Sequence, residues 1–344
     1  MALMMLGGLA SVGMGMGTMV KIREIAFESK QVMLDERARK LTERVRAGKE
    51  RLIVIADFDR TISRYRTSRG APVTTSHGVI ENCELLDETY RKKARDLADY
   101  YIPKEFDASS SEEERTKVCE EWWSKAHDLL LEYGLTRQQL EDAVRNETNL
   151  ELREGCEEMF RMLEKNGVPL LIFSAGLGDV IETFLRTKVF ARAGKIPSNI
   201  HIISNRMRFE TIDLDGWKDD FDKSLLGDVE RSGKIKPSNI RIDRLVGFEG
   251  EIIHSCNKGL TPMRELEAKG LFKNRTTALL LGDSIGDVHM ADWLMGSGYV
   301  RSRVVCERGP YNKKKKHKFQ MKKLKVKLRL VRTEKHQKLL VVVV

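Results

Sequence analysis

Two carboxylates that follow a short apolar run are the residues of this chain best placed to carry out chemistry. Asp57 and Asp59 come directly after residues 52–56, an apolar run in which three residues are β-branched. Such a run predicts a buried strand. Because residues two positions apart on an extended chain point to the same side, both carboxylates can face one small volume at the strand end. A turn cap beside a solvated aspartate is the ordinary alternative, but the strand before the pair and Thr61 after it favour chemistry.

Two further apolar runs also end in small and polar residues. Residues 170–173 precede Ser174 and a pair of small residues, and residues 278–281 precede the sequence Gly-Asp-Ser-Ile-Gly-Asp at 282–287. Small residues between a strand and a helix let backbone N–H groups approach an anion, and the Ser174 hydroxyl is a natural phosphate donor. Glycine turns at such positions are common for steric reasons too, so the stretch around Ser174 is weak evidence by itself.

Asp283 and Asp287, in the last of these stretches, are candidate ligands for a hard cation. Mg²⁺ takes a few carboxylate oxygens together with waters and phosphate, so either aspartate can complete a site with Asp57. Either can instead cap the helix expected to follow. We favour Asp283 as the ligand and leave Asp287 between ligation and support. Lys258 stands in a predicted loop, where a lone lysine is usually solvated.

Composition places the chain among globular proteins with ordinary content. It has 344 residues, of which 41% are hydrophobic and 33% charged, enough for a sizeable core in one or two domains. The five cysteines are scattered and include no CxxC pair. An odd, dispersed set favours reduced thiols in a cytoplasmic compartment and argues against a zinc site or a disulfide framework.

The apolar and polar pattern predicts an α/β fold with a helical insertion. Between residues 78 and 150 the apolar positions recur at three- and four-residue spacing with no strand signal, which predicts a helical cap over the Asp57 end of the sheet. A helical subdomain with no contact to that end is the alternative. The expected parts are an apolar Gly-rich extension at 1–20, an α/β core at 21–72 and 151–305, a cap at 73–150, an irregular insertion at 206–246 and a basic tail at 306–344.

The first 20 residues carry no charge and contain five glycines. A secretory signal needs a positive start and a compact apolar core, and neither is present. A membrane anchor needs roughly 20 apolar residues, so the length just permits one. Because glycine interrupts the stretch throughout, we favour a weakly structured extension.

The four strand-end and loop stretches, taken in order, resemble the motifs of the haloacid dehalogenase superfamily of phosphotransferases. These stretches are DFDRT, FSAG, the lysine of HSCNKG, and LLGDSIGD. The longer sequences ADFDRTISRY, IFSAGLGDVIE and LLGDSIGDVHMAD are similar to the eukaryotic pyrimidine 5′-nucleotidase family, also called cytosolic 5′-nucleotidase III. The resemblance covers roughly residues 25–300 and implies a Rossmann-like, mostly parallel sheet with an inserted helical cap.

The resemblance implies Mg²⁺-dependent hydrolysis of nucleoside 5′-monophosphates, with CMP or UMP favoured and 7-methyl-GMP as a further candidate. Asp57 would be the nucleophile that forms an aspartyl-phosphate, and Asp59 the general acid and base. The implied metal ligands are Asp57, the backbone carbonyl of Asp59, and Asp283. The implied substrate contacts are Ser174, Ala175 and Lys258 for phosphate and Glu105 for the base. Trp122 and Trp123 offer either a stacking face for the base or core packing.

Two departures from the family pattern keep other functions open. Residues 206–246 are longer than the corresponding family segment, and the resemblance stops after about Ser302. The alternatives are another small-molecule phosphatase of the same superfamily, or a catalytically impaired chain that binds nucleic acid through its basic tail.

Almost all of the chain's basicity lies in that tail. Residues 307–344 carry net charge +12 against +10 for the whole chain, and residues 313–332 hold 11 Lys or Arg and no acid. Such a run can bind nucleic acid or an anionic membrane weakly and without sequence specificity. It can also act as a nuclear address, or it can be a solvated tail with no partner. No obligate protein partner is evident from the sequence.

Overall fold

The computed structural model describes residues 48–105, 107, 109–213, 241–261, 263–307, 327–332 and 338–343. Residues Glu50–Arg308 form one compact unit, which contains every candidate site residue. The two chain ends belong to a second unit, whose strands are described by themselves.

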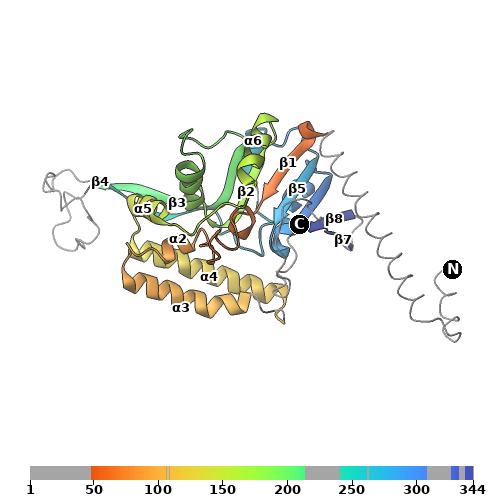
Figure 1. Ribbon diagram of the computed structural model, residues 1–344. Helices are drawn as coiled ribbons and strands as arrows, with labels where there is room; N and C mark the ends of the chain where they lie inside the picture. Colours follow the sequence, from red (N-terminus) through yellow and green to blue (C-terminus); the bar gives the residue numbers. More distant parts are fainter. Residues whose placement is uncertain are drawn as a thin grey trace, which may run out of the picture. The chain divides into compact units, whose positions relative to one another are not determined.

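A mostly parallel sheet forms the centre of the first unit (Figure 1), and its strand order is β4-β3-β2-β1-β5-β6. The strands are β1 Leu52–Ala56, β2 Leu170–Leu177, β3 Ile200–Asp213, β4 Arg241–Glu249, β5 Thr277–Gly282 and β6 Ser302–Glu307. Only the β3–β4 pair among these is antiparallel. Every residue of β1 is buried, as expected for a parallel strand covered on both faces. The predicted α/β fold class is confirmed.

The register of the central strands brings their carboxyl ends level with one another. Ala56, the last residue of β1, pairs with Ile172 of β2 and with Leu281 of β5. The backbone N–H of Asp57 donates to the Leu281 carbonyl at 2.9 Å, so the chain leaves β1 directly beside the end of β5. The residues that follow Ala56, Ile172 and Leu281 on these three strands therefore meet at one edge of the sheet.

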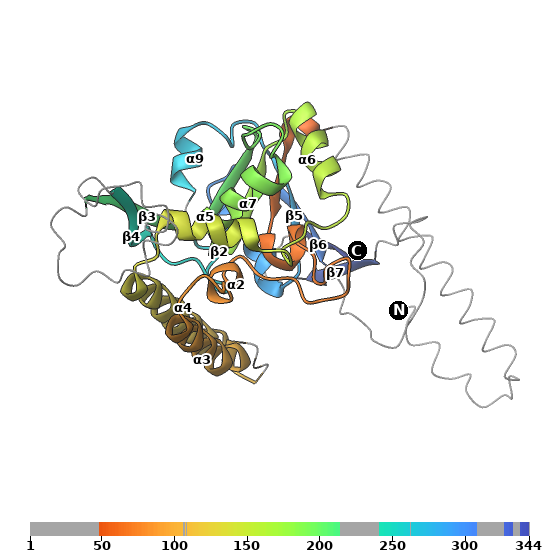
Figure 2. The ribbon, with the colours of Figure 1, turned by 60° about the vertical axis from the view of Figure 1, so that its left-hand side comes forward.

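Helices cover the sheet and follow its strands. They are α5 Arg137–Asn146, α6 Cys156–Lys165, α7 Gly178–Phe184, α9 Arg264–Ala268 and α10 Asp292–Gly296. Helix α7 begins directly after β2 and packs on β2 and β3, and α5 packs on α7 (Figure 2). Short helical turns lie at Lys49–Arg51, Phe58–Ile62, Leu185–Val189 and Ile285–His289.

The predicted helical block consists mainly of a long helical hairpin. Helix α2 Gly78–Glu81 is followed by α3 Glu88–Glu105 and α4 Glu112–Tyr133, which lie side by side (Figure 1). Lys93 contacts Glu132 and Lys125 contacts Tyr101, so residues early in α3 meet residues late in α4 and the two helices are antiparallel. Two capping boxes, at Ser111 and Thr136, begin α4 and α5. These local signals explain why the block is helical throughout.

The expectation of an irregular segment at 206–246 is wrong at both of its ends. Strand β3 continues to Asp213, and its residues 206–213 pair antiparallel with β4. The sequence carries the corresponding signal, since Met207 and Phe209 alternate with charged residues and Met207 is buried. Residues 214–240 lie outside the described chain.

The second unit contains an antiparallel strand pair within the basic tail. Strand β7 Lys327–Arg332 pairs with β8 Lys338–Val343, with Lys327 opposite Val343 and Arg332 opposite Lys338. The expected extension at 1–20 and residues 21–47 of the expected α/β core lie outside the described residues. Across the part of the chain that is described, no helix combines the length and apolar character needed to cross a bilayer.

Candidate active site

A buried lysine joins two aspartates at the carboxyl end of the sheet. The Nζ of Lys258 donates to Asp57 Oδ1 at 2.8 Å and to Asp287 Oδ1 at 2.6 Å. The exposed fractions are only 4% for Lys258, 6% for Asp57 and 1% for Asp287. The ordinary expectation for a lone loop lysine, a solvated side chain, is therefore wrong here, because the loop after β4 turns Lys258 into the end of the sheet.

Burial and neighbouring charges have opposite effects on the pKa values of Asp57 and Lys258. Burial raises the pKa of Asp57 to about 8, and the Lys258 ammonium opposes the rise while Asp287 adds to it. Burial lowers the pKa of Lys258, but the charges of Asp57 and Asp287 outweigh that effect and hold the pKa above its usual value. Lys258 is thus a fixed cation beside the proposed nucleophile.

Asp287 supports the site by fixing two loops at once. Its Oδ2 accepts from the backbone N–H groups of Asp283 and Ser284, at 3.1 and 2.9 Å, while its Oδ1 holds Lys258. Ser284 and Asp287 also form a capping box at the short helix that follows β5. The residue therefore caps that helix and positions the lysine, and both of these contacts belong to the supporting role that the sequence left open for it beside ligation.

Asp59 is held in place by Ser76, which no sequence motif indicated. The Ser76 backbone N–H donates to Asp59 Oδ1 at 2.8 Å, and the Ser76 hydroxyl donates to Oδ2 at 2.6 Å. Burial raises the pKa of Asp59, and the two Ser76 hydrogen bonds reduce that rise. The turn that carries Asp59 contains Arg60 at φ 64°, a left-handed conformation that is unusual for a residue other than glycine. The chain departs sharply from β1 here, as functional turns often do.

The last residues of β2 are fixed by hydrogen bonds within the core. The buried Ser174 hydroxyl accepts from the Gly176 N–H at 3.1 Å. The Asn205 side chain donates to the Ala175 carbonyl at 2.7 Å and bonds the Ile253 backbone through both its amide N–H and its carbonyl oxygen. Asn205, which the sequence gave no reason to select, thereby joins the end of β2 to the loop that leads to Lys258.

Glu105 ends α3 and contacts the Lys258 loop. The Ser255 hydroxyl donates to Glu105 Oε1 at 2.8 Å, and burial raises the pKa of the Glu105 carboxyl. Within the same block, Trp123 lies 4.7 Å from His77 and 5.3 Å from Trp122, measured between ring centroids. The Nε1 of Trp123 and the Nε2 of His77 are buried and have no hydrogen-bond partner. An aromatic cluster with unused polar atoms therefore belongs to the helical block.

The carboxylates at the sheet edge fit a hard divalent cation. One ligand oxygen from each of Asp57, Asp283 and Asp287 lies within 4.8 Å of the others. Burial, followed by the charge of Asp287, raises the pKa of Asp283, so this carboxylate also lacks sufficient positive charge nearby. Burial is the largest cause of the raised pKa values of Asp57, Asp59 and Asp283, and a divalent cation bound to oxygen ligands would favour their charged forms.

Comparisons with known proteins agree on one family. A family model described as pyrimidine 5′-nucleotidase matches residues 60–227 and 241–306. The 7-methylguanosine phosphate-specific 5′-nucleotidase A of Xenopus laevis is 35% identical over 74% of this chain and 74% of its own length. Its Homo sapiens counterpart is 35% identical over 73% of this chain and 71% of its own. The crystal structure of cytosolic 5′-nucleotidase IIIB bound to cytidine matches with a TM-score of 0.58 at 27% identity, over 78% of this chain and 77% of that one.

Proposed function

The chain belongs to the pyrimidine 5′-nucleotidase family, and from that premise we propose that its sheet-edge site hydrolyses nucleoside 5′-monophosphates to nucleoside and phosphate. The observation that carries the proposal is the buried pair of Asp57 and Lys258, with Asp59 fixed beside it by Ser76. A carboxylate nucleophile, an acid two residues later and a fixed cation are the groups that phosphoryl transfer through a covalent intermediate requires.

In the proposed first step, an Asp57 oxygen attacks phosphorus and the bond from phosphorus to the nucleoside O5′ breaks. Asp59, in its protonated form, gives its proton to O5′, and the nucleoside leaves. Water then attacks the phosphorus of the aspartyl-phosphate, Asp59 takes the proton from that water, and the Asp57 carboxylate is released with inorganic phosphate. The raised pKa of Asp59 supports this role, because an acid must hold its proton until the leaving group needs it.

The phosphate is proposed to lie among groups from three strand ends. Lys258 places its ammonium beside the Asp57 carboxylate, and Ser174 and the Ala175 N–H belong to the last part of the neighbouring strand β2. Mg²⁺, held by Asp57, the Asp59 carbonyl and Asp283, would reduce the repulsion between phosphate and carboxylate. Asp287 keeps Lys258 and the Asp283 loop in position.

The base is proposed to meet the helical block, for which we adopt residues 73–150 as a cap. Glu105 supplies a carboxylate that can accept hydrogen bonds from a cytosine amino group or pair with the positive charge of 7-methylguanine. Glu105 contacts Ser255, and Ser255 lies three residues before Lys258 in the neighbouring loop. The aromatic group around Trp123 and His77 offers a stacking face with unused polar atoms. CMP, UMP and 7-methylguanosine 5′-monophosphate are therefore the proposed substrates.

A substrate panel with Mg²⁺ tests this proposal. Phosphate release should be fast from CMP or 7-methylguanosine 5′-monophosphate and slow from phosphoserine. Glu105→Gln should raise KM for the nucleotide, because it removes the charge that reads the base, and should leave release from a base-free sugar phosphate unchanged. Equal loss on both substrates, or preference for phosphoserine, would favour a general small-molecule phosphatase instead.

A further inference from the structure

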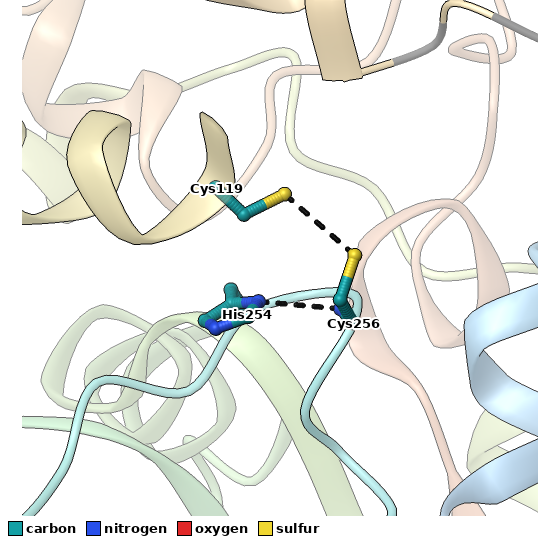
Figure 3. Close-up of side chains that lie close together, drawn as sticks. All are labelled: Cys119, His254 and Cys256. Carbon is teal, nitrogen blue, oxygen red and sulfur yellow. Dashed lines mark hydrogen bonds between the residues drawn. The ribbon is translucent and has the colours of Figure 1, made fainter. Parts of the chain in front are cut away.

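Two cysteines and a histidine that are far apart in sequence meet where the cap block touches the core. Cys119 lies on α4, while His254 and Cys256 lie on the loop between β4 and Lys258 (Figure 3). Their ligand atoms all lie within 4.8 Å of one another. The sequence contains no CxxC pair and therefore argued against a zinc site. Cysteines that are far apart in the sequence, however, can meet in the fold. The fold supplies the missing proximity.

The distance between the two sulfurs matches a shared cation better than a disulfide. Cys119 Sγ lies 3.9 Å from Cys256 Sγ. Two thiolates on a tetrahedral Zn²⁺ with bonds of about 2.3 Å stand about 3.8 Å apart, whereas a disulfide requires about 2.05 Å. Zinc coordination therefore needs almost no movement of either sulfur, and a disulfide needs a large one.

The remaining groups of the cluster are arranged for the same purpose. His254 Nδ1 accepts from the Cys256 backbone N–H at 3.3 Å (Figure 3), a long hydrogen bond that a metal ion bound at this nitrogen would replace. Cys119 and His254 are buried and Cys256 is partly exposed, which leaves a path for an ion to enter. The Ser255 hydroxyl lies 3.5 Å from Cys119 Sγ and donates to Glu105, so a carboxylate stands beside the cluster.

We propose that Cys119, His254 and Cys256 form an inhibitory Zn²⁺ site that joins the cap block to the Lys258 loop. Two cysteines and one histidine are a known ligand set for zinc with a fourth position open, here facing water or Glu105. Binding would release the two thiol protons and cross-link α4 to the loop that carries Lys258. The inhibition rests on the proposed function, because it assumes that Glu105 and Lys258 act in a nucleotide site. Zinc binding does not rest on the proposed function.

Cobalt binding tests the site without any substrate. Full-length protein, kept reduced with a phosphine, is titrated with Co²⁺, and the near-ultraviolet thiolate-to-cobalt absorption is followed. The wild type should show this band and lose it when Zn²⁺ is added. Cys119→Ser and Cys256→Ser should weaken Zn²⁺ competition by more than about 100-fold, because even outer-shell changes cost 10–100-fold. Cys83→Ser, which alters a partly exposed cysteine outside the cluster, should bind as the wild type does.

The thiolate band also separates this site from the carboxylates around Asp57, which cannot produce it. Asp57→Asn should therefore keep the band even if the nucleotidase proposal fails. A folded wild type without the band, or a Cys119→Ser variant that keeps it, overturns the site.

In phosphate-release assays with excess Mg²⁺, low Zn²⁺ should inhibit the wild type and Cys83→Ser but not Cys119→Ser. Equal inhibition of all three would overturn the regulatory role.

Discussion

At the scale of single residues, the site consists of buried charged side chains that pair with one another. Asp57, Lys258 and Asp287 form a chain of ion pairs in which the lysine serves both carboxylates. Breaking such a buried pair leaves an uncompensated charge, which costs far more than losing an exposed pair. The arrangement therefore fixes the proposed nucleophile, at the expense of a strong dependence on each member.

Ser76 should matter for catalysis although no motif contains it. Ser76→Ala removes the hydroxyl donor at 2.6 Å from Asp59 while the backbone donor remains. A hydrogen bond to a charged group contributes about 1.5–3 kcal/mol, so kcat for CMP should fall roughly 10–100-fold. Steady-state phosphate release measures the change.

Ser68→Ala is the matched control for Ser76, because Ser68 donates to Glu151 at an exposed position. Its kcat should equal that of the wild type. If Ser76→Ala also kept full activity, Asp59 would not depend on this serine and the assigned geometry would be wrong.

His127 should make the fold sensitive to acid. It stacks on Phe248 of β4 with ring centroids 3.8 Å apart, and burial followed by the charge of His77 lowers its pKa from 6.5 to about 3. Below pH 6.5 the unfolded chain binds a proton at this histidine and the folded chain does not, so stability falls as pH drops toward 3. The loss is about 1.4 kcal/mol per pH unit.

His127→Phe keeps the ring stack and removes the titration. Urea unfolding should show that the wild type loses about 2 kcal/mol more than the variant between pH 7 and 5. Parallel stability curves for the two proteins over that range would show that His127 is protonated in the folded state.

At the scale of elements, the end of β2 and the segment that precedes α2 are joined at very short range. A Cβ added at Gly176, in β2, would lie 1.8 Å from Ser76 Oγ and 3.0 Å from Asp59 Oδ2. Only glycine lets the end of β2 approach the segment that holds Asp59. The glycine is thus part of the positioning of the acid.

Gly176→Ala should consequently lower kcat at least as much as Ser76→Ala, because the methyl group displaces the Ser76 hydroxyl from Asp59. Gly296→Ala is the control, since nothing lies within 4 Å of its added Cβ. Circular dichroism should show both variants folded. A fully active Gly176→Ala would mean that the segment at Ser76 moves freely, contrary to the geometry described.

The sequence predicted those parts of the fold that local signals determine. The buried strands around Asp57, Ser174 and Asp283 were predicted from apolar runs, and the helical block from its spacing. Ser76 and Asn205 were missed because their roles depend on hydrogen bonds to segments distant in sequence. The β3–β4 pair was missed because the alternation of Met207 and Phe209 with charged residues is short and lies in a segment of mostly charged and polar residues.

At the scale of the whole molecule, charge divides the chain into two parts. The basic excess lies in the tail, while the remainder carries a net charge of −2 and includes the described site. Electrostatic attraction to polyanions, if the tail has it, should therefore act separately from catalysis.

Replacing the four lysines at 313–316 with glutamine tests that separation. The wild type should retard duplex DNA weakly at low salt, and a rise from about 50 to 200 mM salt should abolish the retardation through counterion competition. The variant should bind more weakly and release phosphate from CMP at the wild-type rate. Retardation that ignores both salt and the substitution would assign binding to another part of the chain.

We propose that Asp57 becomes phosphorylated during turnover. Rapid acid quenching of the full chain with Mg²⁺ and CMP radiolabelled in its phosphate preserves an acyl phosphate, and peptide mass spectrometry then locates it. We expect a burst of labelled enzyme with phosphate on Asp57, and neither label nor turnover in a folded Asp57→Asn variant. Turnover by Asp57→Asn, or label on another residue, would contradict it.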